Sequence, residues 1–311
     1  MKKKLKKHAL ENGQTSFKKC QDGRKLRIIF WKAKKIKAYG TIFFLNGHRE
    51  FIEKYSETFR FFLKIGFNVI TLDWRGWGLS DRPFPSRPKV QHITGAAEYQ
   101  LDLDVVISLA KEKKLTKPWH LVAHSLGCLI GLRRLILDPP CFNKYIFLSP
   151  LWGNVRSLPR PIQKLLIRCE KILHFLWLTK ITNQSPKNYK PYSLTVNFKG
   201  NTLTSDKKQF NRLQAILREN TELHSGTPTL GYLIAILKEI DELSLIDLPE
   251  SKILVLLAGE EQITDNDAVL RFIKRQNCIK VEKIEKAQHE ILIEREEIRE
   301  EALSSMHKFL K

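Results

Sequence analysis

The stretch LVAHSLGCLIG, residues 121–131, places a serine where a nucleophile could stand. An apolar run ends just before Ser125, an apolar helical pattern begins just after it, and the small residues Ala123 and Gly127 flank it. A serine on a sharp strand-to-helix turn exposes its hydroxyl, and small neighbours let the strand and the helix approach each other. The same serine would also suit an ordinary helix N-cap, so catalysis needs partners elsewhere in the chain.

A serine nucleophile requires a general base, and the base is usually histidine held by a carboxylate. His289, within KAQHEIL, comes directly after the last predicted strand, 281–286, where its loop would reach the carboxyl edge of a sheet. The other histidines after Ser125 fall in an irregular segment or in the last predicted helix: His174, His224 and His307. Position along the chain therefore favours His289 as the base.

The acid should follow the preceding strand, predicted at 253–259. Its loop reads EEQITDND and offers four carboxylates: Glu260, Glu261, Asp265 and Asp267. Either aspartate or glutamate can hold an imidazole in the required tautomer. Periodicity alone does not choose among the four.

Two backbone N–H groups would have to stabilise the oxyanion. One would come from Leu126, and the other from the loop after the predicted strand 41–45, where Gly47 permits a turn and His48 presents its N–H. The glycine-rich stretch 73–83 lacks the spacing of a dinucleotide fingerprint, so no phosphate cradle is predicted there.

Short β-type runs alternate with helical patterns, which predicts a mostly parallel sheet covered by helices. The predicted strands are 26–31, 41–45, 68–74, 120–124, 145–149, 253–259 and 281–286. The predicted helices are 50–65, 96–113, 126–137 and one near 291–310. The alternation breaks between about 152 and 240, which indicates an insertion between two strands.

Composition narrows the class of protein. The 311 residues are 42% hydrophobic, enough for a large core, and no apolar run reaches the roughly 18 residues of a spanning helix. The basic N-terminus lacks the apolar segment of a signal peptide, and the five cysteines are scattered without a CxxC pair. We therefore expect a cytoplasmic protein without disulfides or zinc. A net charge of +21 favours an anionic partner, and without a nucleic-acid motif we expect the inner membrane surface rather than nucleic acid.

Five segments occur in the order and spacing of the α/β-hydrolase superfamily: FLNG, DWRGWGLSD, LVAHSLG, LLAGEEQITDND and KAQHEIL. More narrowly, the chain resembles the bacterial lysophospholipase and monoacylglycerol-lipase branch, the serine aminopeptidase-like hydrolases. NTLTSD and GTPTLGYL resemble pieces of that branch's cap. The resemblance implies a Ser125–His289–acid triad without metal or organic cofactor. Glu261 falls where the monoacylglycerol-lipase pattern has aspartate, so Glu261 is the expected acid and Asp265 the alternative.

The resemblance implies an α/β-hydrolase fold with a helical cap inserted after the sixth strand. The core would comprise 1–151 and 236–311, and the cap 152–235. The expected activity is cleavage of the acyl ester of lysophospholipids or monoacylglycerols through an acyl-enzyme. The alternatives are a hydrolase of another ester or thioester, or a non-catalytic lipid-binding protein of the same fold. Apolar and basic residues interleave between Lys164 and Lys180 in a predicted helix of the cap, which suits contact with anionic lipid.

Overall fold

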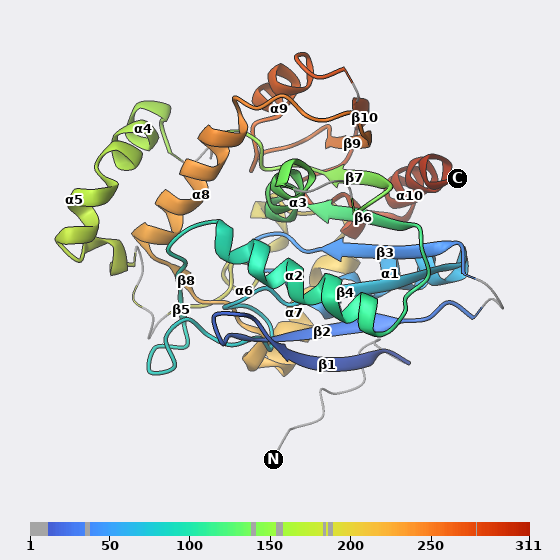
Figure 1. The fold of residues 1–311 in the computed structure, drawn as a ribbon, viewed down its shortest axis with the longest axis horizontal. Coiled ribbons are helices and arrows are strands. Elements are labelled where there is room, and N and C mark those ends of the chain that lie inside the picture. The colour runs from blue at the N-terminus through green and yellow to red at the C-terminus, as the bar shows by residue number, and fades with distance from the viewer. Residues whose placement is uncertain are drawn as a thin grey trace.

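The computed structural model describes residues 12–34, 38–137, 141–153, 158–182, 185, 189–277 and 279–311. The start of the basic N-terminus, residues 1–11, and Cys278 lie outside the described residues. The predicted fold class is confirmed, since a large and mostly parallel sheet lies between two layers of helices (Figure 1).

The main sheet has the strand order β1-β2-β4-β3-β6-β7-β9-β10. Its strands are β1 Gln14–Lys19, β2 Lys25–Trp31, β3 Gly40–Leu45, β4 Phe67–Leu72, β6 Trp119–His124, β7 Lys144–Leu148, β9 Lys252–Ala258 and β10 Ile279–Ile284. The pairs β1/β2 and β2/β4 are antiparallel and the remaining pairs are parallel. A second sheet pairs β5 Val90–Gln91 with β8 Thr227–Pro228. The carboxyl ends of the parallel strands therefore share one edge of the main sheet.

The apolar runs in the sequence arise because both faces of the sheet are covered. In β3, Phe43 and Leu45 belong to the hydrophobic core on one face, whereas Ile42 and Phe44 belong to the core on the other. Successive strand side chains point to opposite faces, so a strand buried on both sides reads as continuously apolar. This is the pattern from which the central strands were predicted.

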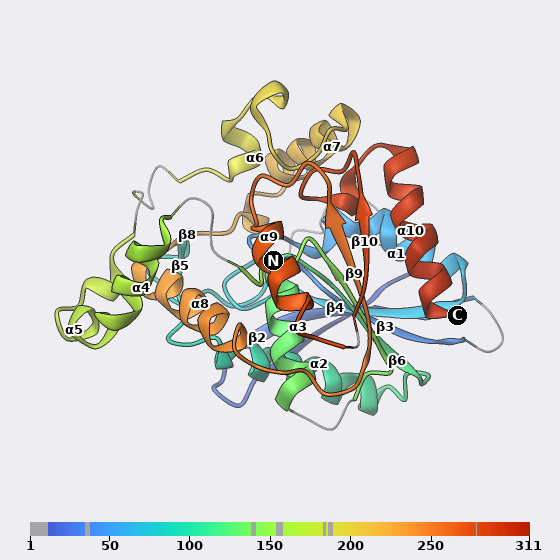
Figure 2. The ribbon, with the colours of Figure 1, turned by 90° about the horizontal axis from the view of Figure 1, so that it is seen from above.

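Ten α-helices are described. Their bounds are α1 Ser56–Lys64, α2 Ala97–Glu112, α3 Leu126–Leu137, α4 Arg160–Arg168, α5 Glu170–Phe175, α6 Tyr192–Thr195, α7 Lys207–Glu219, α8 Leu230–Leu243, α9 Asn266–Ile273 and α10 Glu296–Leu310. The short 3₁₀ helices are η1 Ile52–Tyr55, η2 Leu178–Lys180, η3 Phe198–Gly200, η4 Thr221–Leu223 and η5 Ile291–Ile293. Seen from above, α2 and α3 cover one face of the sheet, and α1 and α10 cover the other (Figure 2). No described helix is long and apolar enough to cross a bilayer.

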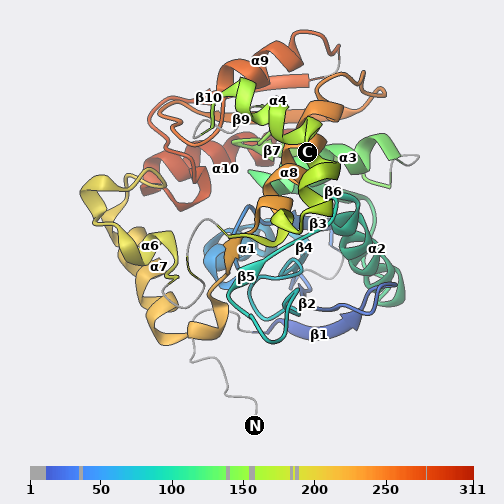
Figure 3. The same ribbon diagram turned by 90° about the vertical axis from the view of Figure 1, so that its left-hand side faces the viewer.

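The segment between β7 and β9 divides into two parts at the carboxyl edge of the sheet. Figure 3 looks onto this edge and shows α4 and α8 in front of the strands, with α6 and α7 to one side. The side part is joined to the core, since Gln209 of α7 donates to Glu57 of α1 over 2.9 Å. Helix α8 runs without a break through residue 235, where the cap was predicted to end, and its Ile240 and Leu243 lie in the core beside α3.

The sequence missed the edge strand β1 and misjudged some helix starts. β1 reads QTSFKK, and its side chains are exposed or only half-buried, so it carries no apolar run that could reveal it. The range 50–65, predicted as one helix, contains η1 followed by α1, and the range predicted near 291–310 contains η5 followed by α10. The side chains of η5 are buried, and η5 comes shortly before the amphipathic helix α10.

Candidate active site

Ser125 occupies a strained turn between β6 and α3. Its backbone φ is +52°, in the left-handed region that residues other than glycine rarely adopt. The Ser125 N–H donates to the carbonyl of Leu148 on the neighbouring strand over 3.0 Å, and its own carbonyl accepts from the N–H of Cys128. The turn is thus held from both sides, as a nucleophile elbow requires.

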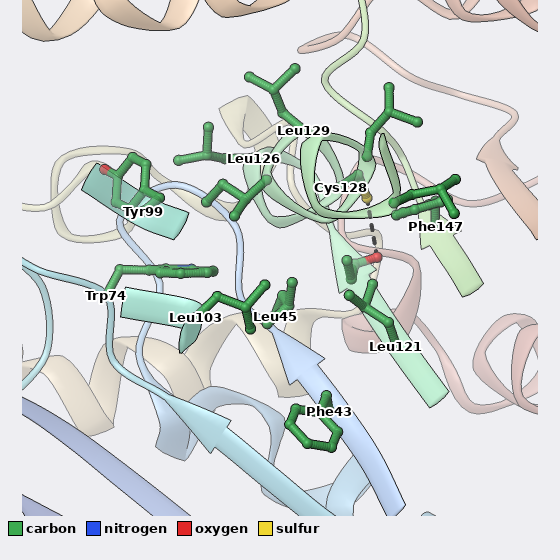
Figure 4. Packing of buried hydrophobic residues seen from close by; sticks show 14 of the residues in the cluster. Phe43, Leu45, Trp74, Tyr99, Leu103, Leu121, Leu126, Cys128, Leu129 and Phe147 are labelled. Atoms are coloured by element: carbon green, nitrogen blue, oxygen red, sulfur yellow. Dashed lines mark hydrogen bonds between the residues drawn. The ribbon is translucent and has the colours of Figure 1, made fainter. Parts of the chain in front are cut away.

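Packing beneath α3 explains the glycine two residues after the serine. A Cβ atom at Gly127 would lie 2.4 Å from the carbonyl oxygen of Leu45, so only glycine lets the helix start this close to β3. The thiol of Cys128 donates to the carbonyl of Ala123 over 3.2 Å, and Figure 4 shows Cys128, Leu126 and Leu129 among the apolar side chains that anchor α3. This packing fixes the start of α3 and therefore the position of Ser125.

His289 lies in the loop after β10 and Glu261 lies in the loop after β9, and both loops reach the turn that carries Ser125. His289 Nε2 lies 3.0 Å from Ser125 Oγ, and His289 Nδ1 lies 2.8 Å from Glu261 Oε2. Gly259 permits the approach of the two loops, because a Cβ there would lie 1.9 Å from the carbonyl oxygen of Glu285. The structure therefore brings together the serine, the histidine and the acid expected from the sequence.

The carboxylate of Glu261 is held on both of its oxygens. Oε1 accepts from the backbone N–H groups of Ile263 and Thr264 at 2.7 and 3.1 Å, which leaves Oε2 for His289. Burial would raise the pKa of this carboxyl, but the hydrogen bond to His289 and the charge of the imidazole outweigh burial and lower the pKa to about 2. Glu261 is therefore an ionised and fixed hydrogen-bond acceptor.

Asp265, the alternative acid, has a different position. It is the N-cap of α9, and its Oδ1 accepts from the N–H of Ala268 over 3.0 Å. Its other oxygen lies 3.9 Å from a guanidinium nitrogen of Arg271. The Asp265 carboxylate thus accepts from a free N–H group in the first turn of α9, and this capping role accounts for its position.

Of the two residues expected to supply the oxyanion donors, Leu126 directly follows the serine and His48 lines the same cavity. Leu126 is the first residue of α3, so its N–H has no acceptor within the helix. His48 lines the same cavity as Ser125, and its ring lies between Trp77 and Tyr232 with centroids 5.4 Å from each. Burial and the charge of Arg49 hold the pKa of His48 well below its usual range.

The sequence did not reveal a buried charged cluster behind the triad, which consists of Glu50, Lys54, Tyr55, His124 and Glu290. The Glu50 carboxylate accepts from Lys54 Nζ over 2.7 Å, from Tyr55 Oη over 2.8 Å and from the N–H of Gly47 in the oxyanion loop. Lys54 Nζ also lies 2.5 Å from Glu290 Oε1, next to His289 in the chain. We call this set the Glu50 cluster.

His124 links the Glu50 cluster to the catalytic histidine. Its Nε2 donates to the backbone carbonyl of His289 over 3.0 Å, and its Nδ1 lies 3.0 Å from Glu50 Oε1. Both ring nitrogens face acceptors, which favours the doubly protonated ring. Burial opposes this charge, but the Glu50 carboxylate outweighs burial and raises the pKa of His124. Glu50 thus ties together three segments: the oxyanion loop, the residue before Ser125, and the His289 loop.

A cavity of about 570 Å³ opens beside Ser125 and His289. Much of its lining is apolar, contributed by Phe51, Leu203, Leu213, Leu217, Leu223 and Ile263. A larger hollow of about 1270 Å³ lies at the amino ends of β6, β7 and β9, and none of the three triad residues lines it. Within the described residues, no group of three potential ligands is placed to hold a metal ion. The cavity beside Ser125 therefore has the mostly apolar lining, with a few polar groups, that is typical of ligand pockets.

This fold, with a serine at the elbow and a histidine hydrogen-bonded to it, defines an α/β-hydrolase. The serine aminopeptidase (S33) family matches residues 36–296, and the chain belongs to this family. The resemblance predicted from the sequence is thereby confirmed.

Two relatives align with most of the chain. The probable lysophospholipase L2 of Haemophilus influenzae is 29% identical over 269 residues, which covers 86% of this chain and 82% of the relative. Lysophospholipase L2 of Escherichia coli K12 is 24% identical over 280 residues, with coverage of 85% and 78%.

Solved structures of similar fold include two lipases. A soluble variant of monoglyceride lipase from Saccharomyces cerevisiae superposes with a TM-score of 0.73 at 16% identity, covering 100% of this chain and 97% of the other. A monoacylglycerol lipase from Paleococcus ferrophilus gives 0.68 at 18% identity, with coverage of 92% and 98%. Family, relatives and fold agree, and the chain is a hydrolase.

Proposed function

We propose that the chain cleaves the acyl ester of lysophospholipids or monoacylglycerols, with Ser125, His289 and Glu261 as its catalytic triad. The observation that carries this proposal is the continuous hydrogen-bonded series from Ser125 through His289 to Glu261, which ends at an apolar cavity. Lysophospholipase relatives and monoacylglycerol-lipase neighbours support the substrate class.

In the first half-reaction, Ser125 Oγ attacks the ester carbonyl while His289 Nε2 takes its proton. The carbonyl oxygen becomes an oxyanion, for which the N–H groups of Leu126 and His48 are the proposed donors. His289 then returns the proton to the departing glycerol oxygen, and the acyl group stays on Ser125. Glu261 stabilises the imidazolium that forms in between.

In the second half-reaction, His289 takes a proton from water as the water oxygen attacks the acyl carbonyl. The bond to Ser125 breaks, the proton passes from His289 to Ser125 Oγ, and the fatty acid leaves. The apolar wall of the cavity would hold the acyl chain. Leu213 and Leu217 belong to this wall and stand one turn apart on α7.

Residues 152–235 form the proposed cap, which supplies part of that wall. Helices α4 and α5 and the segment after them expose a set of apolar side chains, here called the cap patch: Ile162, Leu165, Ile172, Phe175, Leu176, Trp177 and Ile181. Phe175 is 79% exposed and Trp177 is 71% exposed. Exposed lysine and arginine side chains lie among them: Lys164, Arg168 and Lys171. We propose that the cap patch enters the headgroup region of an anionic membrane, with the protein in the cytoplasm.

The first experiment measures fatty-acid release from lysophosphatidylcholine and from monoacylglycerol, side by side, by the parent protein and by Ser125→Ala. We expect release that vanishes in the variant. A folded parent protein that releases fatty acid from neither lipid would argue against this substrate class. Fatty-acid release that persists in Ser125→Ala would show that Ser125 is not the nucleophile.

Sedimentation with liposomes tests the cap patch. The double variant Phe175→Ser/Trp177→Ser should bind vesicles of anionic lipid less than the parent does at low salt. Leu137→Ser is the matched control, since Leu137 is 55% exposed at the end of α3. Equal binding by all three proteins would contradict membrane contact through the cap patch.

A further inference from the structure

Two cationic side chains line the cavity beside Ser125, and their surroundings differ. Lys54 Nζ is paired with the carboxylates of Glu50 and Glu290 at 2.7 and 2.5 Å, so its charge is balanced within the protein. Arg49 lines the same cavity and forms no ion pair with any described residue. Its Nε is buried and has no acceptor in the described part of the chain. The cavity therefore holds one guanidinium whose charge is not balanced by any carboxylate of the described residues.

A second donor without an acceptor stands next to Arg49. The ring of Tyr189, a residue of the cap, lies with its centroid 5.3 Å from the Arg49 guanidinium carbon. Tyr189 is only 5% exposed, lines the same cavity, and its hydroxyl is buried without a hydrogen-bond partner among the described residues. Buried polar groups are almost always hydrogen-bonded, so two unpartnered donors side by side call for an acceptor from outside the chain.

The backbone places this pair close to the expected reaction. Arg49 directly follows His48, whose N–H is a proposed oxyanion donor, and the positive charge of Arg49 contributes to the lowered pKa of the His48 ring. The φ of Arg49 is +61°, a left-handed conformation that favours glycine or asparagine over arginine. Strained backbone of this kind is characteristic of binding and catalytic sites.

We propose that Arg49, together with the Tyr189 hydroxyl, binds the phosphate of a lysophospholipid whose ester lies at Ser125. This inference rests on the proposed function and deepens it, because it selects the phosphate-bearing substrate over the neutral monoacylglycerol. Arginine presents paired N–H donors that match the oxygens of a phosphate. In a lysophospholipid only the glycerol backbone separates the ester from the phosphate, and Ser125 and Arg49 line one cavity, so a single ligand can reach both. A monoacylglycerol offers only neutral hydroxyl oxygens to the two donors and no negative charge to the Arg49 guanidinium.

The test compares lysophosphatidylcholine and monoacylglycerol of the same acyl chain, presented in the same neutral detergent. Arg49→Gln keeps the polar character of the side chain and removes its charge. We expect kcat/KM on lysophosphatidylcholine to fall about 10- to 100-fold, the effect of losing a charge-assisted hydrogen bond, and to change far less on monoacylglycerol. Tyr189→Phe should cause a smaller loss, about 3- to 10-fold, on the same substrate. Arg60→Gln, on an exposed position of α1, is the matched control and should leave both rates unchanged.

A structural role for Arg49 would give a different result. If the guanidinium served only to pack the cap against the core, Arg49→Gln would lower both rates equally or lower the melting temperature, and phosphate binding would be refuted while the triad enzyme stood. If the parent protein hydrolyses neither lipid, the proposed function fails. Binding of the two lipids to Ser125→Ala, with and without Arg49→Gln, then tests the phosphate contact alone. Equal affinities of the two proteins for lysophosphatidylcholine would overturn it.

Discussion

Replacing Glu261 by glutamine should disable the enzyme through the hydrogen-bonding pattern of the carboxylate. Oε1 accepts from the N–H groups of Ile263 and Thr264, so the amide oxygen of the introduced glutamine must take that place. The amide NH₂ then faces His289 Nδ1 and donates to it. This selects the tautomer with its proton on Nε2, which cannot accept the proton of Ser125.

The structure also gives the expected size of the fall in kcat for Glu261→Gln. The pKa of Glu261, lowered from 4.5 to about 2, corresponds to about 3 kcal/mol in favour of the carboxylate, to which His289 is the largest favourable contributor. Loss of that stabilisation from the imidazolium costs a factor of about 10² in rate. The wrong tautomer adds to this loss, so we expect kcat to fall about 10³- to 10⁴-fold.

The assay is fatty-acid release under saturating lysophosphatidylcholine, with circular dichroism to establish that each variant is folded. Asp265→Asn is the matched control, because asparagine also caps helices and the N-cap bond to Ala268 can be kept. It should retain nearly full activity. A loss of less than 10-fold in Glu261→Gln, or an equal loss in Asp265→Asn, would refute the assignment of Glu261 as the triad acid.

Three further predictions concern the framework of the site. Gly127→Ala should lower the free energy of unfolding by about 1–3 kcal/mol and reduce activity, because its Cβ would lie 2.4 Å from the Leu45 carbonyl oxygen; denaturant unfolding that matches the parent would contradict this. Glu50→Gln should lower kcat about 10- to 100-fold, because burial then dominates and the pKa of His124 falls. The loss of kcat in Glu50→Gln should grow as the pH rises. A pH profile of kcat that runs parallel to that of the parent would argue against a positioning role for Glu50. The folded-state pKa of Glu261 is about 2, below its ordinary value of 4.5, so its contribution to stability is complete above about pH 4.5 and is lost as the pH falls towards 2. The difference in melting temperature between the parent and Glu261→Gln should therefore close over that interval, and a difference that stays constant would show that the carboxylate has no such linkage.

Local sequence was sufficient for the features that depend on nearest neighbours. Central strands buried on both faces read as apolar runs, so their positions followed from composition. Ser125 could be named because it directly follows such a strand, whereas His289 follows the partly exposed edge strand β10 and was named from its place after the last predicted strand. Parallel strands bring the residues after them to one edge of a sheet. The edge strand β1 was missed for the converse reason, since its exposed side chains leave no apolar run.

The acid, the Glu50 cluster and the pair Arg49–Tyr189 depended on the tertiary structure. Glu261 and Asp265 lie four residues apart in one loop, and their roles separate only because α9 begins after Asp265 and uses its side chain as a cap. The Glu50 cluster joins residues far apart in the chain, whose pairing no local pattern encodes. Sequence therefore determined which residues reach the edge of the sheet, because strand periodicity is local. Only the fold decided which of them meet, because hydrogen bonding and burial depend on groups that the chain brings together from a distance.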